Sequence, residues 1–145
     1  MTSLEDDPPV TASDRAVELT LAAAEAADEK LAKNIVAFDV SDHLAITDVF
    51  LVCSGANARQ VGAIVDEIER RLSESCGVKP LRREGHRDNR WVLLDYFDIV
   101  VHVMDPEERA FYDLERLWKD CPAIPLPAPV ARPGAAVGES AGGAG

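Results

Sequence analysis

The run DVFLVCS at residues 48–54 constrains the fold most, because it is apolar on both faces when extended. Successive side chains of a strand point to opposite sides of a sheet, so the apolar residues form two sets: Val49, Leu51 and Cys53 on one face, Phe50 and Val52 on the other. A strand of this kind belongs inside a sheet that is covered. The run therefore predicts a central strand.

A helix is expected directly after this strand. Gly55 ends the strand, Asn57 is a good N-cap and Gln60 follows three residues later, so the helix begins near Ala58. Gly77 suits the residue after the helix C-terminus, and Pro80 prevents continuation. The segment has the strongest helical apolar periodicity in the chain, through Val61, Ile64, Val65, Ile68 and Leu72.

The flanking segments supply further elements. An Ala-rich helix is predicted from an N-cap at Ser13 to about Lys33, with a thin apolar stripe of Val17, Leu21, Ala24 and Leu31. A short strand is predicted at residues 35–40. Residues 81–90 are polar and hold a short edge strand before Glu84 and Gly85.

Residues 90–118 predict two strands at a tight bend, followed by a capped helix. The second strand alternates: Ile99, Val101 and Val103 line one face, and Asp98, Val100, His102 and Met104 line the other. Asp105 is a good N-cap, Pro106 suits the first helical position and Glu108 completes a capping box. Helical spacing predicts two faces: a core stripe of Phe111, Leu114 and Trp118, and a partner-facing set of Arg109, Tyr112 and Arg116.

The element order is thus α-β-β-α-(β)-β-β-α, which predicts an α/β domain with two or three layers around a mixed sheet flanked by helices. Its 145 residues, 47% of them hydrophobic, suffice for one domain. We expect residues 1–12 to be disordered because they are acidic and contain two prolines. Residues 121–145, rich in Pro, Ala and Gly, predict a disordered tail, so the ordered domain spans 13–120.

Composition limits the class of function. The formal net charge of -11 disfavours binding to nucleic-acid phosphates, DNA included, and favours a basic protein surface as the partner. Three cysteines without paired spacing indicate reduced thiols and a cytoplasmic protein. No apolar run approaches the roughly 20 residues that cross a bilayer, so we expect no membrane insertion.

A search for catalytic chemistry finds one weak candidate. The Ser54–Gly55 turn before a helix is similar to the start of nucleotidyltransferases, whose following strand carries two carboxylates for magnesium. Here Asp95 and Asp98 are three residues apart, which is the wrong spacing for one strand face. The histidines lack metal-ligand spacing and no nucleotide fingerprint occurs. We therefore expect no metal, no cofactor and no catalysis.

The first strand of the bend is the best candidate for binding. Trp91, Leu93 and Asp95 share one of its faces. If helices leave that face uncovered, it is an aromatic and aliphatic patch beside a carboxylate, as in protein interfaces. The same alternation would also arise from a buried sheet face, so interface and core both stay open.

Three segments together resemble one known family: ITDVFLVCSGANARQVGAIVDEIE, EGHRDNRWVLLDYFDIVVHVM and ERAFYDLERLW. They are similar in order and spacing to the ribosomal silencing factors, also called Iojap-like or RsfS proteins, over residues 16–119. The resemblance implies a nucleotidyltransferase-like α/β fold without the catalytic metal site. It also implies a glycine in the strand bend, where this chain has Phe97, a residue that disfavours a turn with positive φ.

The resemblance further implies a bacterial cytoplasmic factor. Such a factor binds the large ribosomal subunit at ribosomal protein fourteen, blocks joining of the small subunit, represses translation when nutrients are short, and is often a homodimer when free. The partner-binding residues implied here are Trp91, Leu93, Leu94, Asp95, Asp98, His102, Arg109, Tyr112, Glu115 and Trp118.

Two other functions stay open. A degenerate nucleotidyltransferase requires Ser54, Asp95 and Asp98 to converge around magnesium. A dimeric adaptor unrelated to ribosomes predicts that Trp91→Ala alters self-association alone. The ribosome-binding function predicts that Trp91, Asp95 and Tyr112 lie together on an accessible surface.

Overall fold

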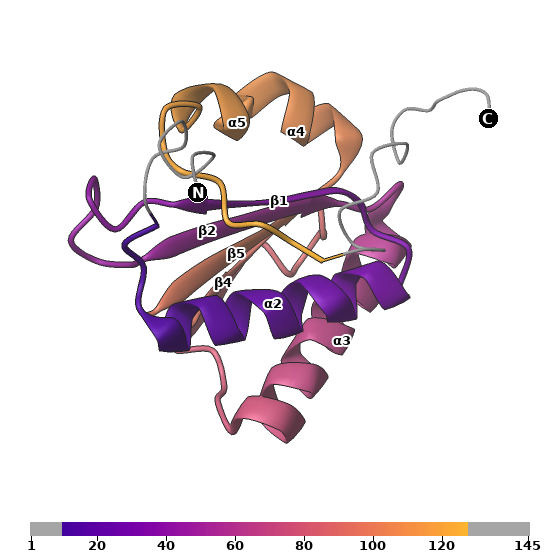
Figure 1. Ribbon diagram of the computed structural model, residues 1–145. Helices are drawn as coiled ribbons and strands as arrows, with labels where there is room; N and C mark the ends of the chain where they lie inside the picture. Colours follow the sequence, from indigo (N-terminus) through magenta and orange to yellow (C-terminus); the bar gives the residue numbers. More distant parts are fainter. Residues whose placement is uncertain (1–9, 128–145) are drawn as a thin grey trace.

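The computed structural model describes residues 10–127, which form a five-stranded mixed sheet between two helical layers (Figure 1). The strand order is β1-β2-β5-β4-β3. The strands are β1 (Lys33–Asp39), β2 (Val49–Ser54), β3 (Arg82–Glu84), β4 (Trp91–Asp95) and β5 (Ile99–Met104). Only the β2–β5 pair is parallel among the pairs of this sheet in the described residues. The predicted fold class, the interior position of residues 49–54 and the edge position of β3 are confirmed.

The helices divide between the two faces of the sheet. The long helices α2 (Asp14–Glu29) and α3 (Ala58–Cys76) cover one face. The short helices α4 (Pro106–Tyr112) and α5 (Leu114–Leu117) lie over the other, at the top of Figure 1. The arrangement is therefore three-layered, which decides between the two alternatives left by the sequence. No helix within residues 10–127 is long and apolar enough to span a bilayer.

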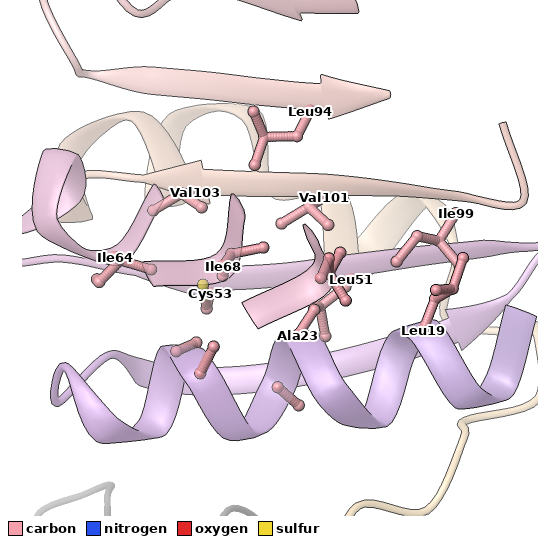
Figure 2. Close-up of a cluster of buried hydrophobic side chains, with 14 of the residues drawn as sticks. Leu19, Ala23, Leu51, Cys53, Ile64, Ile68, Leu94, Ile99, Val101 and Val103 are labelled. Carbon is pink, nitrogen blue, oxygen red and sulfur yellow. The ribbon is translucent and has the colours of Figure 1, made fainter. Parts of the chain in front are cut away.

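The larger core lies between the sheet and the pair α2 and α3 (Figure 2). Leu51 and Cys53 of β2 project into it beside Ile64 and Ile68 of α3. All five residues of the stripe predicted for α3 are buried. The caps of this helix are also as predicted: the Asn57 side chain accepts from the Gln60 N–H at 2.9 Å, and Gly77 has φ 70°.

The helix α2 differs from its prediction in length and in its buried face. It ends at Glu29, and Leu31 beyond it has φ 64° and is 68% exposed. Val17 and Leu21 are only half-buried, whereas Leu19 and several alanines are buried. Alanines have no bulk beyond Cβ, so this face lets α2 pack closely on the sheet and on α3.

The continuous helix predicted after Asp105 is broken. Asp105 caps α4 through the Glu108 N–H as predicted, but Asp113 has φ 49° and separates α4 from α5. A left-handed residue changes the direction of the chain, so helical spacing no longer places residues 111, 114 and 118 on one face. Leu114 is buried, yet Phe111 is 79% exposed. The predicted core stripe is wrong at Phe111.

The chain beyond α5 does not become a free tail at residue 121. It runs along β1, where the Asp39 N–H donates to the Pro122 carbonyl at 2.8 Å and the Ile124 N–H to that of Ala37 at 3.0 Å. Cys121 and Ile124 are buried. The predicted tail is therefore wrong for residues 121–127. The disorder predicted for residues 1–12 is wrong at Thr11 and Ala12, whose N–H groups donate to the Asp39 carboxylate. The rest of both predictions, at 1–9 and 128–145, lies outside the described residues.

The bend between β4 and β5 is a tight turn centred on Phe97. The Asp98 N–H donates to the Tyr96 carbonyl at 2.8 Å, and the Phe97 N–H donates to the Asp95 carboxylate at 2.9 Å. Phe97 has φ 73°, a left-handed value that a bulky side chain disfavours. The turn keeps positive φ although the residue is not glycine.

Gly85 lies in the loop between β3 and β4, where the backbone of β4 leaves no room for a side chain. A Cβ there would lie 1.9 Å from the Trp91 carbonyl oxygen, at φ 82°. We expect Gly85→Ala to lower the free energy of unfolding by roughly 2–4 kcal/mol, because backbone must shift. Gly77→Ala, at φ 70° with nothing within 4 Å, should cost only about 1 kcal/mol. Urea denaturation measures both, and equal losses would contradict this account.

Candidate partner-binding face

The outer face of β4 is only partly covered. The helices α4 and α5 lie over the outer face of the sheet, where Leu114 packs against Val52 and Met104, and Val100 and His102 of β5 are also buried. On the neighbouring β4, Trp91, Leu93 and Asp95 are half-buried. Solvent therefore reaches the three side chains that the sequence grouped on one face. We call Trp91, Leu93, Asp95 and the adjoining Tyr112 the β4 face.

An aromatic cluster joins the β4 face to the helical layer. The Trp91 indole N–H donates to Nδ1 of His102 at 3.1 Å, and the ring centroids of Trp91 and Tyr112 are 4.6 Å apart. On the other side of His102, the Phe50 ring contacts the imidazole edge-on, with the ring centroids 4.8 Å apart. The ring centroids of Phe50 and Trp118 are 5.5 Å apart. Tyr112 is 46% exposed, so the cluster presents an accessible aromatic edge.

His102 acts inside this cluster and does not reach the surface. Burial lowers the pKa of its imidazole to about 4, so the ring is neutral at neutral pH. A neutral ring can accept the Trp91 N–H at Nδ1, which fixes the orientation of the indole. His102 therefore holds Trp91 in place from within the protein and is not itself exposed on the β4 face.

Arg109 anchors the outer helices. Its guanidinium is buried, donates from Nη1 to the Ser54 hydroxyl at 2.9 Å and from Nε to the Glu115 carboxylate at 2.9 Å. These bonds join α4 and α5 to the end of β2. A buried charge is stable only when it is paired and hydrogen-bonded, as it is here. Helical spacing did not find the pair, because six residues and a helix break separate Arg109 from Glu115.

Three of the implied contact residues are buried within the protein: His102, Arg109 and Leu94. Arg109 was expected on a partner-facing surface, but its guanidinium is used internally. Leu94 was grouped with the contact residues of its strand, yet it points into the core with α2 and α3 and is fully buried. Strand alternation explains the burial of Leu94, because this residue lies on the face opposite Leu93.

The acidic residues lie apart from the aromatic cluster. Asp95 is at the far end of β4 from Trp91, where its carboxylate meets Arg82 at 3.4 Å. Asp98 is half-buried just before β5. Of the three residues that the ribosome-binding function predicts to lie together, Trp91 and Tyr112 are in contact, whereas Asp95 is on the same strand as Trp91 but outside the aromatic cluster.

Ser54, Asp95 and Asp98 do not converge. Ser54 is level with Met104 and Asp95 is level with Val100, four residues apart along β5. That separation is roughly 13 Å at the rise of a strand, far beyond a shared magnesium shell. Ser54 is also bonded to a cationic guanidinium. The arrangement required by a nucleotidyltransferase is contradicted.

The sequence missed one surface. Phe111 and Leu117 are 79% and 68% exposed and flank a shallow depression of about 620 Å³ on α4 and α5. The signal is present as apolar residues in a charged helix, but helical spacing assigns Phe111 to the core and gives Leu117 no role. The depression adjoins Tyr112, so it widens the accessible apolar area next to the β4 face.

Residues 13–141 match the family model described as "Ribosomal silencing factor during starvation". The chain belongs to the ribosomal silencing factor family.

Individual relatives agree with the family. The chain is 41% identical over 109 residues to "Ribosomal silencing factor RsfS" of Halalkalibacterium halodurans, covering 75% of this chain and 92% of that one. A crystal structure from Chromobacterium violaceum superposes with a TM-score of 0.68 at 37% identity, covering 70% of this chain and 84% of that chain. The mouse protein named "Mitochondrial assembly of ribosomal large subunit protein 1" is 32% identical over 89 residues, covering 60% of this chain and 39% of that protein.

The buried imidazole predicts a pH dependence of stability. The unfolded histidine has a pKa near 6.5 and the folded one about 4, so acid protonates the unfolded state first. The contribution of the neutral His102 to the free energy of unfolding should be fully present above pH 6.5. It should fall by roughly 3 kcal/mol as the pH drops to 4. Urea denaturation across this range should show a flatter dependence of unfolding free energy on pH for His102→Phe than for wild type. An equally steep profile for His102→Phe would contradict the assignment.

Proposed function

We propose that this protein binds the large ribosomal subunit through ribosomal protein fourteen, blocks joining of the small subunit and so represses translation when nutrients are limiting. Family membership supports a role in translation regulation. The mouse relative is named for the assembly of the ribosomal large subunit, which supports that subunit as the site of action. The β4 face supplies the surface.

The observation that carries the proposal is the accessible Trp91–Tyr112 pair on an incompletely covered sheet. Tryptophan and tyrosine are enriched among the residues that dominate binding energy, because they bury a large area at little entropic cost. Hydrogen bonding to His102 holds the indole in place before binding. A pre-ordered aromatic edge beside Leu93 suits a protein partner with an apolar recess.

Charge favours a protein component of the ribosome over its RNA. The net charge of -11 repels phosphate and attracts basic protein surfaces. A factor of this charge is steered toward a basic ribosomal protein and away from the surrounding RNA. Its affinity should weaken as salt screens the attraction.

The mechanism is steric and needs no cofactor. A bound factor has only to occupy a surface that the small subunit must contact, and a standard interface of about 800 Å² per partner is sufficient for a stable complex. Such a factor works where ribosomes are, in the bacterial cytoplasm. A homodimer that used the β4 face would compete with the ribosome for it.

Co-sedimentation with purified large subunits tests the proposal. We expect wild type to bind and binding to weaken with salt, while Tyr112→Ala reduces affinity roughly ten-fold through loss of an aromatic anchor. Asp95→Arg should reduce it by charge reversal, with circular dichroism showing retained fold. Asp66→Arg, on an exposed position of α3 in the opposite layer, is the matched control.

Absence of wild-type binding would sink the proposal. Normal ribosome binding by Trp91→Ala with altered self-association would instead support the dimeric adaptor. Analytical ultracentrifugation of the same variants measures that second property.

A further inference from the structure

Three strongly exposed apolar side chains lie at one end of the sheet. Ile46, Leu81 and Phe97 are 72%, 70% and 63% exposed. Backbone bonds place their segments at the same end: the Asp48 N–H donates to the Asp98 carbonyl at 3.0 Å, and the Leu81 N–H to that of Asp95 at 2.7 Å. We call Ile46, Leu81 and Phe97 the apolar end.

Phe97 is the unusual member of this set. Its φ of 73° is strained for a residue with a bulky side chain, and glycine would adopt it freely. The exposed ring contributes little packing to the isolated protein. Strain that brings no folded-state benefit is a reason to look for a role in binding.

Carboxylates surround the apolar end. In the described part of the chain, no hydrogen bond or ion pair engages the side chains of Asp42 and Asp98. Asp48 accepts one bond, from the Ser13 N–H at 2.9 Å, and Asp95 is shared with Arg82. Apart from Arg82, which is paired with Asp95, the charges named here are negative, and two of these carboxylates are unpaired within residues 10–127. Apolar side chains in such surroundings are complementary to an apolar recess with a basic rim.

We propose that Phe97, flanked by Ile46 and Leu81, inserts into an apolar recess of a basic protein surface and extends the β4 face to the end of the sheet. The inference rests on the proposed function, and the occupant is the same ribosomal protein surface. Phe97 lies six residues beyond Trp91, roughly 20 Å along the strand. One standard interface spans that distance.

The chain contains a matched control for Phe97. Leu31 also has positive φ, 64°, and is 68% exposed. It lies at the other end of the sheet, where the Gln60 side chain at the start of α3 donates to its carbonyl at 3.1 Å. Replacement by glycine relieves similar strain at both positions. Each replacement removes a large apolar side chain, but only Phe97 belongs to the proposed interface.

The experiment measures affinity for large subunits and melting temperature for full-length Phe97→Gly and Leu31→Gly. Both variants should melt at or above the wild-type temperature. Phe97→Gly should bind roughly ten-fold more weakly, and Leu31→Gly should bind like wild type. Ile46→Ser is a second test at the apolar end that leaves the turn unchanged, and it should also weaken binding.

The other outcomes overturn the inference, the proposed function or both. Wild-type affinity in Phe97→Gly and Ile46→Ser would overturn the inference and leave the proposed function standing. Failure of wild type to bind would overturn both. Unchanged ribosome affinity with lost self-association would assign the apolar end to a second copy of this chain, which also overturns the inference.

Discussion

Complete burial of β5 is the constraint on which the rest of the structure depends. All six of its residues are buried, including Val101 on one face and His102 on the other. A strand of this kind needs a helical layer on each side. The long helices provide one layer, in which α2 packs through a face rich in alanine and α3 through a face of Val, Ile and Leu. The short helices α4 and α5 provide the other layer.

The second layer is small, and its size creates the candidate binding surface. Arg109 holds it at the end of β2 through Ser54 and Glu115. On β4 the layer contacts Trp91, and Leu93 and Asp95 remain half-buried. Trp91 then fills the boundary between covered and open sheet, bonded to His102 beneath and touching Tyr112 above. The same contacts that complete the core thus orient the aromatic edge offered to a partner.

Both the proposed function and the apolar end describe a protein that works by surface complementarity. Ser54, where a catalytic turn would bind a cation, is bonded to the guanidinium of Arg109. Asp95 meets Arg82 at the opposite end of β4. A metal enzyme gathers its carboxylates around one cation. Here the carboxylates are spread around apolar side chains, an arrangement suited to a basic protein surface.

The sequence by itself determined the elements whose signals are local: the caps at Asn57 and Asp105, the apolar face of α3, and the alternation that separates Leu93 from Leu94. These depend on residues within one or two turns of each other. Tertiary structure alone decided that Arg109 is buried, that Phe111 is exposed and that residues 121–127 pack on β1. The physical reason is that each depends on partners distant in sequence, or on the left-handed break at Asp113, which no helical periodicity reveals.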